Sequence, residues 1–281
     1  MRILTIVLLT ILVITSMHAL ALKKRSKSTP SLTFDFLGST QNYRRIGSGT
    51  PIVLLHGSMV ASGWSGFEDK LAEQYSVYIP DLPGFGGSSA IDGKLHNSDL
   101  FTLAFCEFLK VNNLESAPII SLSLGSIVSL KSARNGCTTG KLILVGLPTV
   151  FGGWRAKLAQ KIPLLLKRII VASDWGKRKV LTPALNENTE GEAKEGSDSF
   201  IRDLAATDVR AIADVDYEGD IRDSLSLLTA VGNQKLLLYG EFDTQRKGLS
   251  PNEYRVVLNA GHNIFSSNQD HLLTIVEDFL K

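Results

Sequence analysis

A serine flanked by small residues is the first side chain in this sequence whose type and position suit nucleophilic catalysis. Ser123 lies in Ser121-Leu122-Ser123-Leu124-Gly125, between an apolar run that predicts a strand and a segment that predicts a helix. Small residues two positions before and after a serine let the backbone turn sharply, which would hold its hydroxyl above a helix N-terminus. The N–H of Leu124 would then donate to a developing oxyanion. Alone, the pattern is more typical of a serine that caps a helix.

A serine hydroxyl is a weak nucleophile unless a base takes its proton. Of the five histidines, His262 is the best placed, because it follows an apolar run in the flexible turn Asn259-Ala260-Gly261-His262-Asn263. Of the other four, His18 lies in the N-terminal apolar segment and His96 in a polar loop. His56 is expected to have a structural role after a strand, and His271 to be exposed at the start of a helix.

A carboxylate that orients the imidazole would complete a catalytic triad. Glu241 and Asp243 both follow a predicted strand at residues 235–239. Asp243 is the preferred candidate, since the residues just past a strand form the loop over the carboxyl edge of the sheet, and Glu241 is the reserve. Asp243 follows Ser123 by 120 residues and precedes His262 by 19. Each residue alone suits a plain loop, but this order, with each one after a strand, indicates serine-hydrolase chemistry.

A second oxyanion donor is expected from His56-Gly57-Ser58-Met59, which follows an apolar run at residues 51–55. A glycine after a strand permits close backbone approach, so the next N–H groups can point into a crevice. We expect the donor to be the N–H of Ser58 or Met59, with His56 in a structural role.

Alternating strands and helices must position these side chains. Apolar runs predict strands at residues 51–55, 75–80, 117–121, 141–145, 235–239 and 253–258, with weaker antiparallel strands within 38–49. Helical spacing of apolar residues predicts helices at 67–74, 98–111 and 271–280. Such alternation indicates a parallel sheet with right-handed crossovers.

Residues 151–233 interrupt the alternation and contain no clear strand. An insertion of this length is usually a lid or helical cap. It opens with a basic stretch from Arg155 to Lys179, interleaved with apolar residues, and continues with an acidic stretch from Glu187 to Asp223. The basic stretch is consistent with a solvated helical face or with docking to an anionic membrane surface.

The N-terminus predicts a membrane or export segment within residues 1–22. Ile3 to Leu22 is mostly apolar and uncharged, and as a helix it would span about 30 Å, the thickness of a hydrocarbon core. Four basic residues between positions 23 and 27 favour a single-pass anchor, because positive charge stays on the cytoplasmic side. The alternative is a signal peptide, cleaved after Ala19-Leu20-Ala21, and an exported body. A polar tether at 23–33 would lead to a catalytic domain at 34–281.

Composition excludes several classes of protein. The chain has 281 residues, 44% hydrophobic and 21% charged, which is ordinary for a globular domain and excludes a disordered chain, a collagen-like repeat and a coiled coil. Beyond five N-terminal basic residues, the chain carries 25 basic and 28 acidic side chains, so its charge does not indicate a nucleic-acid partner. Cys106 and Cys137 predict neither a disulfide framework nor a zinc site, and we expect small buried residues. Metal and cofactor motifs are absent, so no cofactor is expected.

Taken together, the motifs resemble the α/β-hydrolase superfamily over residues 38–280. The resemblance rests on Leu54-Leu55-His56-Gly57, on Ile-Pro-Asp-Leu-Pro-Gly-Phe-Gly-Gly-Ser at residues 79–88, on the Ser123 segment, on Gly240-Glu241-Phe242-Asp243 and on Ala260-Gly261-His262. It implies an eight-stranded, mostly parallel sheet with helices on both faces and a helical cap after strand six. It also implies Ser123 as nucleophile, His262 as general base and Asp243 as the acid. Ser121 departs from the usual glycine, which weakens assignment to a subfamily.

The expected function is hydrolysis of a carboxylic ester, including lipid-derived esters, through a Ser-His-Asp triad and an acyl-enzyme. The expected partners are a small-molecule ester or lipid substrate and a membrane contacted through the N-terminal segment. A serine nucleophile argues against dehalogenase or epoxide-hydrolase chemistry. Cleavage of an amide or a carbon–carbon bond by the same groups remains an alternative, as does a non-catalytic protein of this fold that binds a ligand.

Overall fold

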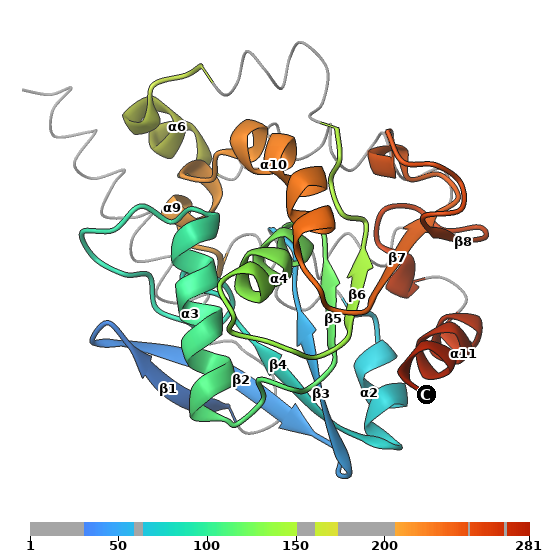
Figure 1. Cartoon of the computed structure of the whole chain (residues 1–281). Coiled ribbons are helices and arrows are strands. Elements are labelled where there is room, and N and C mark those ends of the chain that lie inside the picture. The colour runs from blue at the N-terminus through green and yellow to red at the C-terminus, as the bar shows by residue number, and fades with distance from the viewer. Residues whose placement is uncertain (1–30, 59–63, 151–160, 174–205, 247, 267–268) are drawn as a thin grey trace, which may run out of the picture.

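The computed structural model describes residues 31–58, 64–150, 161–173, 206–246, 248–266 and 269–281 (Figure 1). The predicted N-terminal membrane or export segment and Met59 lie outside these ranges. Within them, no helix combines the length and hydropathy that a membrane crossing requires.

In the described part of the chain, eight strands form one sheet, as predicted, in the order β1-β2-β4-β3-β5-β6-β7-β8. Their bounds are β1 Leu32–Phe36, β2 Ser39–Ile46, β3 Thr50–Leu55, β4 Tyr75–Pro80, β5 Ile119–Leu122, β6 Leu142–Val145, β7 Lys235–Gly240 and β8 Arg255–Val257. β1 and β2 are antiparallel to their neighbours, whereas β3 to β8 are mutually parallel. The carboxyl ends of β3 to β8 therefore lie at one edge. β1 begins at Leu32, inside the stretch that we expected to be a tether.

Helices cover both faces of the sheet (Figure 1). One face carries α3 (Ser98–Val111), α4 (Leu124–Arg134) and α10 (Tyr217–Ala230), and the other carries α2 (Phe67–Ala72) and α11 (Gln269–Leu280). The central strands β3, β5 and β6 are mostly apolar, as is typical of parallel strands with both faces buried. α3 begins where the Asn97 side chain accepts the N–H of Leu100, a typical N-cap.

The described parts of residues 151–233 are helical and contain no strand. They form α6 (Leu164–Val171), α9 (Val209–Ala213) and α10. α10 packs on α4 and carries Ile221 and Leu227 into the main core, so it covers the sheet instead of standing above it. A buried ion pair fixes it there, with Lys131 Nζ 2.8 Å from Asp220 Oδ1. Two short 3-10 turns follow later, Thr244–Arg246 and Ile264–Ser266.

The expectation for the two cysteines is wrong, because Cys106 and Cys137 form a disulfide. Cys106 lies on α3 and Cys137 follows the end of α4, and both are half-buried. The packing of α3 against α4 brings their Cα atoms to 5.3 Å, although 31 residues separate them in the sequence. Counting cysteines missed the pair because this proximity depends on how the two helices pack.

Replacing both cysteines by serine is expected to lower the free energy of unfolding by about 2–4 kcal/mol, because a cross-link limits the unfolded chain. Urea titration measures the change. Wild-type protein kept reduced should unfold at the same midpoint as the double variant. Equal midpoints for oxidised wild type and the double variant would contradict a stabilising disulfide.

Candidate active site

The predicted site residues lie at the ends of parallel strands, on one edge of the sheet. His56, Gly57 and Ser58 follow β3, Ser123 follows β5, and Asp243 and His262 follow β7 and β8. The shared edge explains how residues as far apart as positions 57 and 262 come to one place.

Ser123 occupies the sharp turn between β5 and α4 that its sequence predicts. Its φ of 52° and ψ of −114° place a non-glycine residue in a region that costs on the order of 1–3 kcal/mol. The Ser123 N–H donates to the carbonyl of Val145 at 2.8 Å, which ties the turn to the end of β6. Leu124 is the first residue of α4, so its N–H belongs to the helix N-terminus, where intrahelical acceptors are lacking.

Asp243 and His262 form the pair that the sequence predicts. Asp243 Oδ2 lies 2.8 Å from His262 Nδ1, and the other carboxylate oxygen accepts the Gln245 N–H at 2.9 Å. The Asp243 side chain is buried, whereas the imidazole is partly exposed. Glu241, the reserve candidate, is exposed and accepts the N–H of Asn259 at 3.0 Å, so it braces the neighbouring turn. The structure thus favours Asp243 over Glu241 as the partner of the imidazole.

Gly146, at the end of β6, connects the Ser123 turn with the imidazole. A β-carbon on Gly146 would lie 2.7 Å from Cε1 of His262 and 3.3 Å from Oδ2 of Asp243. The preceding residue, Val145, accepts the backbone N–H of Ser123. The imidazole therefore rests on the backbone segment to which the serine turn is bonded, which places the three predicted triad residues around the end of β6.

Gly146→Ala is expected to lower kcat on the order of 10²-fold, because the added methyl group would push the imidazole away from Asp243. Gly146 also has a φ of +56°, which strains any other residue, so a control must carry similar strain. Gly38 has a φ of +73° and open space around the position of a β-carbon, so Gly38→Ala is that control. Steady-state kinetics of both variants makes the test. Equal kcat values in the two would contradict the contact.

His56 fixes the peptide that carries the predicted oxyanion donor. Its Nε2 accepts the N–H of Leu82 at 2.9 Å, so the proton resides on Nδ1, which donates to the Gly57 carbonyl at 2.6 Å. The Gly57 carbonyl and the Ser58 N–H belong to one trans peptide, so this N–H points away from the imidazole. A β-carbon on Gly57 would lie 3.2 Å from that of Ser123. The Ser58 backbone thus borders the serine turn, and His56 has the predicted structural role.

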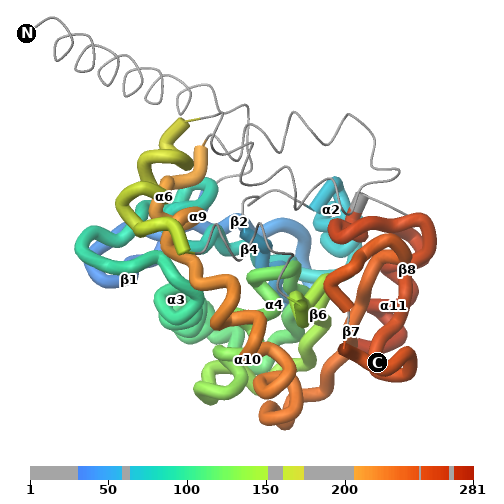
Figure 2. The backbone as a smooth tube through the Cα atoms, turned by 90° about the horizontal axis from the view of Figure 1, so that it is seen from above, coloured from blue at the N-terminus to red at the C-terminus, as the bar shows by residue number. Residues whose placement is uncertain are grey.

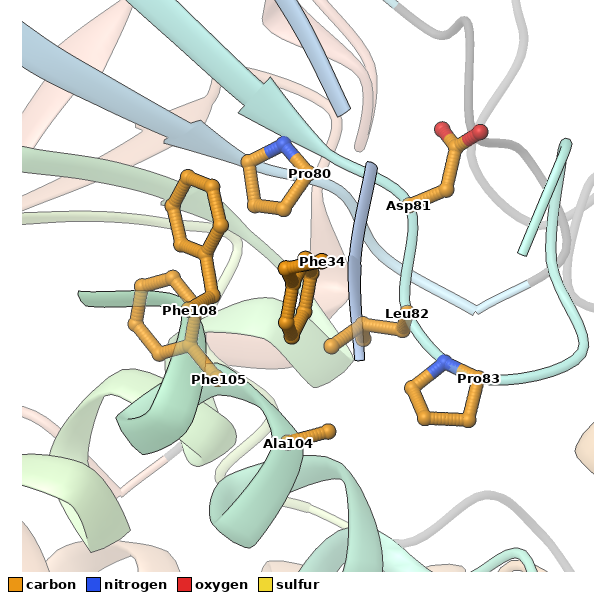
Figure 3. Close-up of a pocket in the computed structure, with 8 residues that line it drawn as sticks. All are labelled: Phe34, Pro80, Asp81, Leu82, Pro83, Ala104, Phe105 and Phe108. Atoms are coloured by element: carbon orange, nitrogen blue, oxygen red, sulfur yellow. The ribbon is translucent and has the colours of Figure 1, made fainter. Parts of the chain in front are cut away.

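The segment at residues 79–88 supplies the other partner of His56. Asp81 Oδ2 accepts the Gly87 N–H at 2.7 Å and the Ser88 hydroxyl donates to the Asp81 carbonyl at 2.6 Å, which closes a tight turn. Below this turn lies a pocket too narrow for a water molecule, lined by Phe34, Phe105 and Phe108 among others (Figure 3). The Asp81 carboxylate points away from these rings (Figure 3). The motif therefore builds a scaffold for the Leu82 N–H.

Stability is expected to fall between pH 7 and pH 4, partly through His56. Burial lowers the pKa of His56 to about 4, from 6.5 in an unfolded chain. The neutral ring of His56 contributes at most about 3 kcal/mol to the free energy of unfolding. This contribution is complete above pH 6.5 and is lost as the pH falls toward 4. Burial also lowers the pKa of His96, so the comparison is between wild type and His56→Gln.

Urea unfolding at a series of pH values measures how the free energy of unfolding depends on pH. The His56→Gln variant should be less stable than wild type at pH 7 and should lose less stability down to pH 4. If the free energy of unfolding depended on pH equally in His56→Gln and in wild type, the contribution assigned to His56 would be contradicted.

Tyr217 is a site residue that sequence reasoning missed. It is the first residue of α10, and its side chain hydrogen-bonds that of Ser58. Burial raises the pKa of Tyr217 to about 12, so the hydroxyl is neutral at pH 7. Ser224, further along α10, donates to the Pro148 carbonyl at 2.8 Å and helps to hold the helix. No motif surrounds Tyr217 in the sequence, whereas Gly146 had the weak signal of a glycine directly after a predicted strand.

Comparison with known proteins places these observations in a family. A model described as the alpha/beta hydrolase family matches residues 52–272. A pimeloyl-acyl-carrier protein methyl ester esterase of Pseudoalteromonas atlantica is 26% identical over 272 residues, which cover 86% of this chain and 99% of that protein.

Two further similarities are a shorter sequence alignment and a solved structure of similar fold. A 2-hydroxy-6-oxononadienedioate/2-hydroxy-6-oxononatrienedioate hydrolase of Pseudomonas putida is 36% identical over 112 residues, which cover 37% of this chain and 39% of that protein. A solved esterase structure from Thermogutta terrifontis has a TM-score of 0.72 at 18% identity and covers 90% of this chain and 98% of its own. At 18% identity, the similarity to the Thermogutta terrifontis esterase concerns the fold alone.

Proposed function

The chain belongs to the alpha/beta hydrolase family, and we propose that it hydrolyses carboxylic esters through an acyl-enzyme on Ser123. The observation that carries the proposal is the buried Asp243 carboxylate 2.8 Å from His262 Nδ1, at the sheet edge where the Ser123 turn projects. The strained turn at Ser123 adds support, because a backbone in such a conformation is typical of a nucleophile held above a helix N-terminus.

The proposed reaction assigns one role to each group. Ser123 Oγ attacks the ester carbonyl while Nε2 of His262 takes its proton, and Asp243 stabilises the imidazolium through Nδ1–H. The backbone N–H groups of Ser58 and Leu124 donate to the oxyanion. His262 then protonates the departing alcohol, and water activated by the same imidazole releases the acid.

Tyr217 and Met59 have no direct role in the proposed reaction. The Tyr217–Ser58 hydrogen bond would position the loop that follows Gly57, so Tyr217 is a positioning residue. Met59 was predicted as an alternative oxyanion donor and lies outside the described residues. Ser58 is the donor that we propose, because its N–H belongs to the peptide whose carbonyl is held by His56.

The comparisons support an ester as the first substrate class. The relative that aligns over nearly its full length is named as a methyl ester esterase. A second candidate is hydrolytic cleavage of a carbon–carbon bond, because the relative with 36% identity is named as a hydrolase of a 2-hydroxy-6-oxo dienedioate. An amide substrate and a non-catalytic ligand-binding role are further alternatives from the sequence.

A substrate panel distinguishes these candidates. Purified full-length protein is given methyl esters with acyl chains of increasing length, the matched amides, and a 2-hydroxy-6-oxo dienedioate. The proposal expects esters to be cleaved at least 10²-fold faster than the amides, with a preferred chain length. Faster turnover of the dienedioate than of every ester would favour carbon–carbon cleavage, and no turnover at all would favour a binding protein.

We also propose that the catalytic domain faces an oxidising compartment and is released there by cleavage after Ala21, because an anchor at residues 3–22 followed by the basic residues at 23–27 would keep the domain on the cytoplasmic side. The Cys106–Cys137 disulfide supports this, because such bonds are rare in reducing compartments. Cells are denatured in a large maleimide, with and without prior reduction. Both cysteines should react only after reduction, and reaction without reduction would contradict the proposal. N-terminal sequencing distinguishes the anchor from the cleaved signal.

A further inference from the structure

Helix α6 carries an apolar face that is turned toward solvent. Leu165 is 73% exposed, Leu166 48% and Ile169 61%, and Leu164 at the start of the helix is also exposed. Positions 165 and 169 are four apart and 166 and 169 three apart, so these side chains form one stripe. Isolated exposed leucines are common on protein surfaces, but four large apolar side chains within six residues form a patch.

The body holds α6 by its opposite side. Val171 packs with Ile212 and Ala213, and the Arg168 guanidinium donates from Nε at 2.8 Å and Nη2 at 2.6 Å to the buried carboxylate of Asp214. Asp214 also accepts the backbone N–H of His96 at 3.1 Å. These contacts fix the direction of the apolar stripe, which therefore faces outward from a firmly attached helix.

The first turn of α6 stands away from the body. A cavity of about 340 Å³ lies between this turn and the segment that leads into α10, and it is lined by Lys161, Leu164, Lys167, residues 213–216 and Glu218. Figures 1 and 2 place α6 beside α9 at the periphery of the molecule, on the side to which the carboxyl edge of the sheet points. Among the described residues, the stripe therefore lies on the outer side of α6.

The sequence that contains and flanks α6 is basic. Residues 155–179 contain eight lysines and arginines and a single acid, Asp174. Among the described members of this stretch, Lys161 is exposed just before α6, whereas the charge of Arg168 is compensated by Asp214. Large apolar side chains next to basic ones match the boundary between acyl chains and anionic headgroups.

We propose that the exposed stripe of α6 docks on the surface of a lipid bilayer that contains anionic headgroups. A second copy of this chain fits less well, because two basic stretches would face each other and a stripe on an eight-residue helix is small for the roughly 800 Å² that each partner of a stable interface buries. The proposal does not depend on the hydrolase activity. It is also a contact separate from the predicted N-terminal segment, and it would turn the active-site edge toward the lipid.

Quenching by brominated lipid tests the contact in the full-length chain. An environment-sensitive fluorophore is attached through Leu165→Cys, with the native disulfide intact, and the protein is reconstituted in vesicles of phosphatidylcholine with about 30% phosphatidylglycerol. Bromine on the acyl chains quenches a probe only when the probe reaches the lipid. The control is the same probe introduced through Leu103→Cys, since Leu103 is 55% exposed on α3.

The probe at position 165 should lose at least half of its emission in brominated vesicles, whereas the probe at 103 should lose less than a tenth. Pure phosphatidylcholine, or the change Lys161→Glu, should reduce quenching at 165 at least twofold. No quenching at 165, or equal quenching at both positions, would overturn the proposal. A blue-shifted but unquenched probe would overturn it too, because protein instead of lipid would then cover the stripe. Quenching independent of lipid charge would overturn the assignment to anionic headgroups.

Discussion

Ser123→Ala is expected to lower kcat for ester hydrolysis by on the order of 10⁴-fold or more, because no other group would form the acyl-enzyme. The oxyanion donors and the Asp243–His262 pair are left in place by this change. Affinity for a product acid should therefore stay within about twofold of wild type. Steady-state kinetics and product titration measure the two effects, and an unchanged kcat would exclude Ser123 as nucleophile.

A glycine at the same position provides the matched control for folding. Ser123→Gly removes the hydroxyl just as alanine does, so the loss of activity should be equally large. It also relieves the strain of a φ of 52°, and it should be more stable than Ser123→Ala by about 1 kcal/mol. A glycine variant that is inactive but more stable shows that inactivity does not come from misfolding.

Asp243→Asn is expected to lower kcat by about 10⁴-fold while the fold is kept. The amide is nearly isosteric with the carboxylate, so the site stays filled, but a side-chain amide does not stabilise an imidazolium and favours the wrong tautomer of His262. Asp243 is buried, and the contact that this substitution changes is the one of 2.8 Å between its Oδ2 and Nδ1 of His262.

Glu241→Gln is the control, since Glu241 is an acid of the same loop whose carboxylate accepts only a backbone N–H in the described contacts. Its kcat should remain within about twofold of wild type. If Glu241→Gln lost as much activity as Asp243→Asn, the reserve candidate would be the true partner. If neither lost activity, no carboxylate of this loop would act in catalysis.

Much of this site was predictable from the sequence because parallel strands place their carboxyl ends at one edge. Apolar runs located β3 to β8 within a few residues, and the residues after them were necessarily neighbours. The preference for Asp243 over Glu241 followed from the same reasoning, and the structure pairs Asp243 with His262. The structural role of His56 was expected as well, although the sequence did not reveal its hydrogen bond to Leu82.

The features that were missed depend on packing between distant elements. The Cys106–Cys137 bond requires that α3 and α4 lie side by side, and two cysteines in a sequence do not carry that information. Tyr217 reaches Ser58 because the ion pair between Lys131 and Asp220 holds α10 on α4. A pattern of apolar residues predicts that a helix exists, but not which surface it covers.

The most direct test of the account is the site of covalent labelling by a fluorophosphonate, since this reagent reports an activated serine without requiring the natural substrate. Intact mass and peptide mapping of the treated full-length chain should show one adduct, on Ser123. The adduct should be absent in Ser123→Ala and should form far more slowly in Asp243→Asn. An unlabelled wild type, or an adduct on any other serine, would contradict the claim that Ser123, His262 and Asp243 act as one catalytic unit.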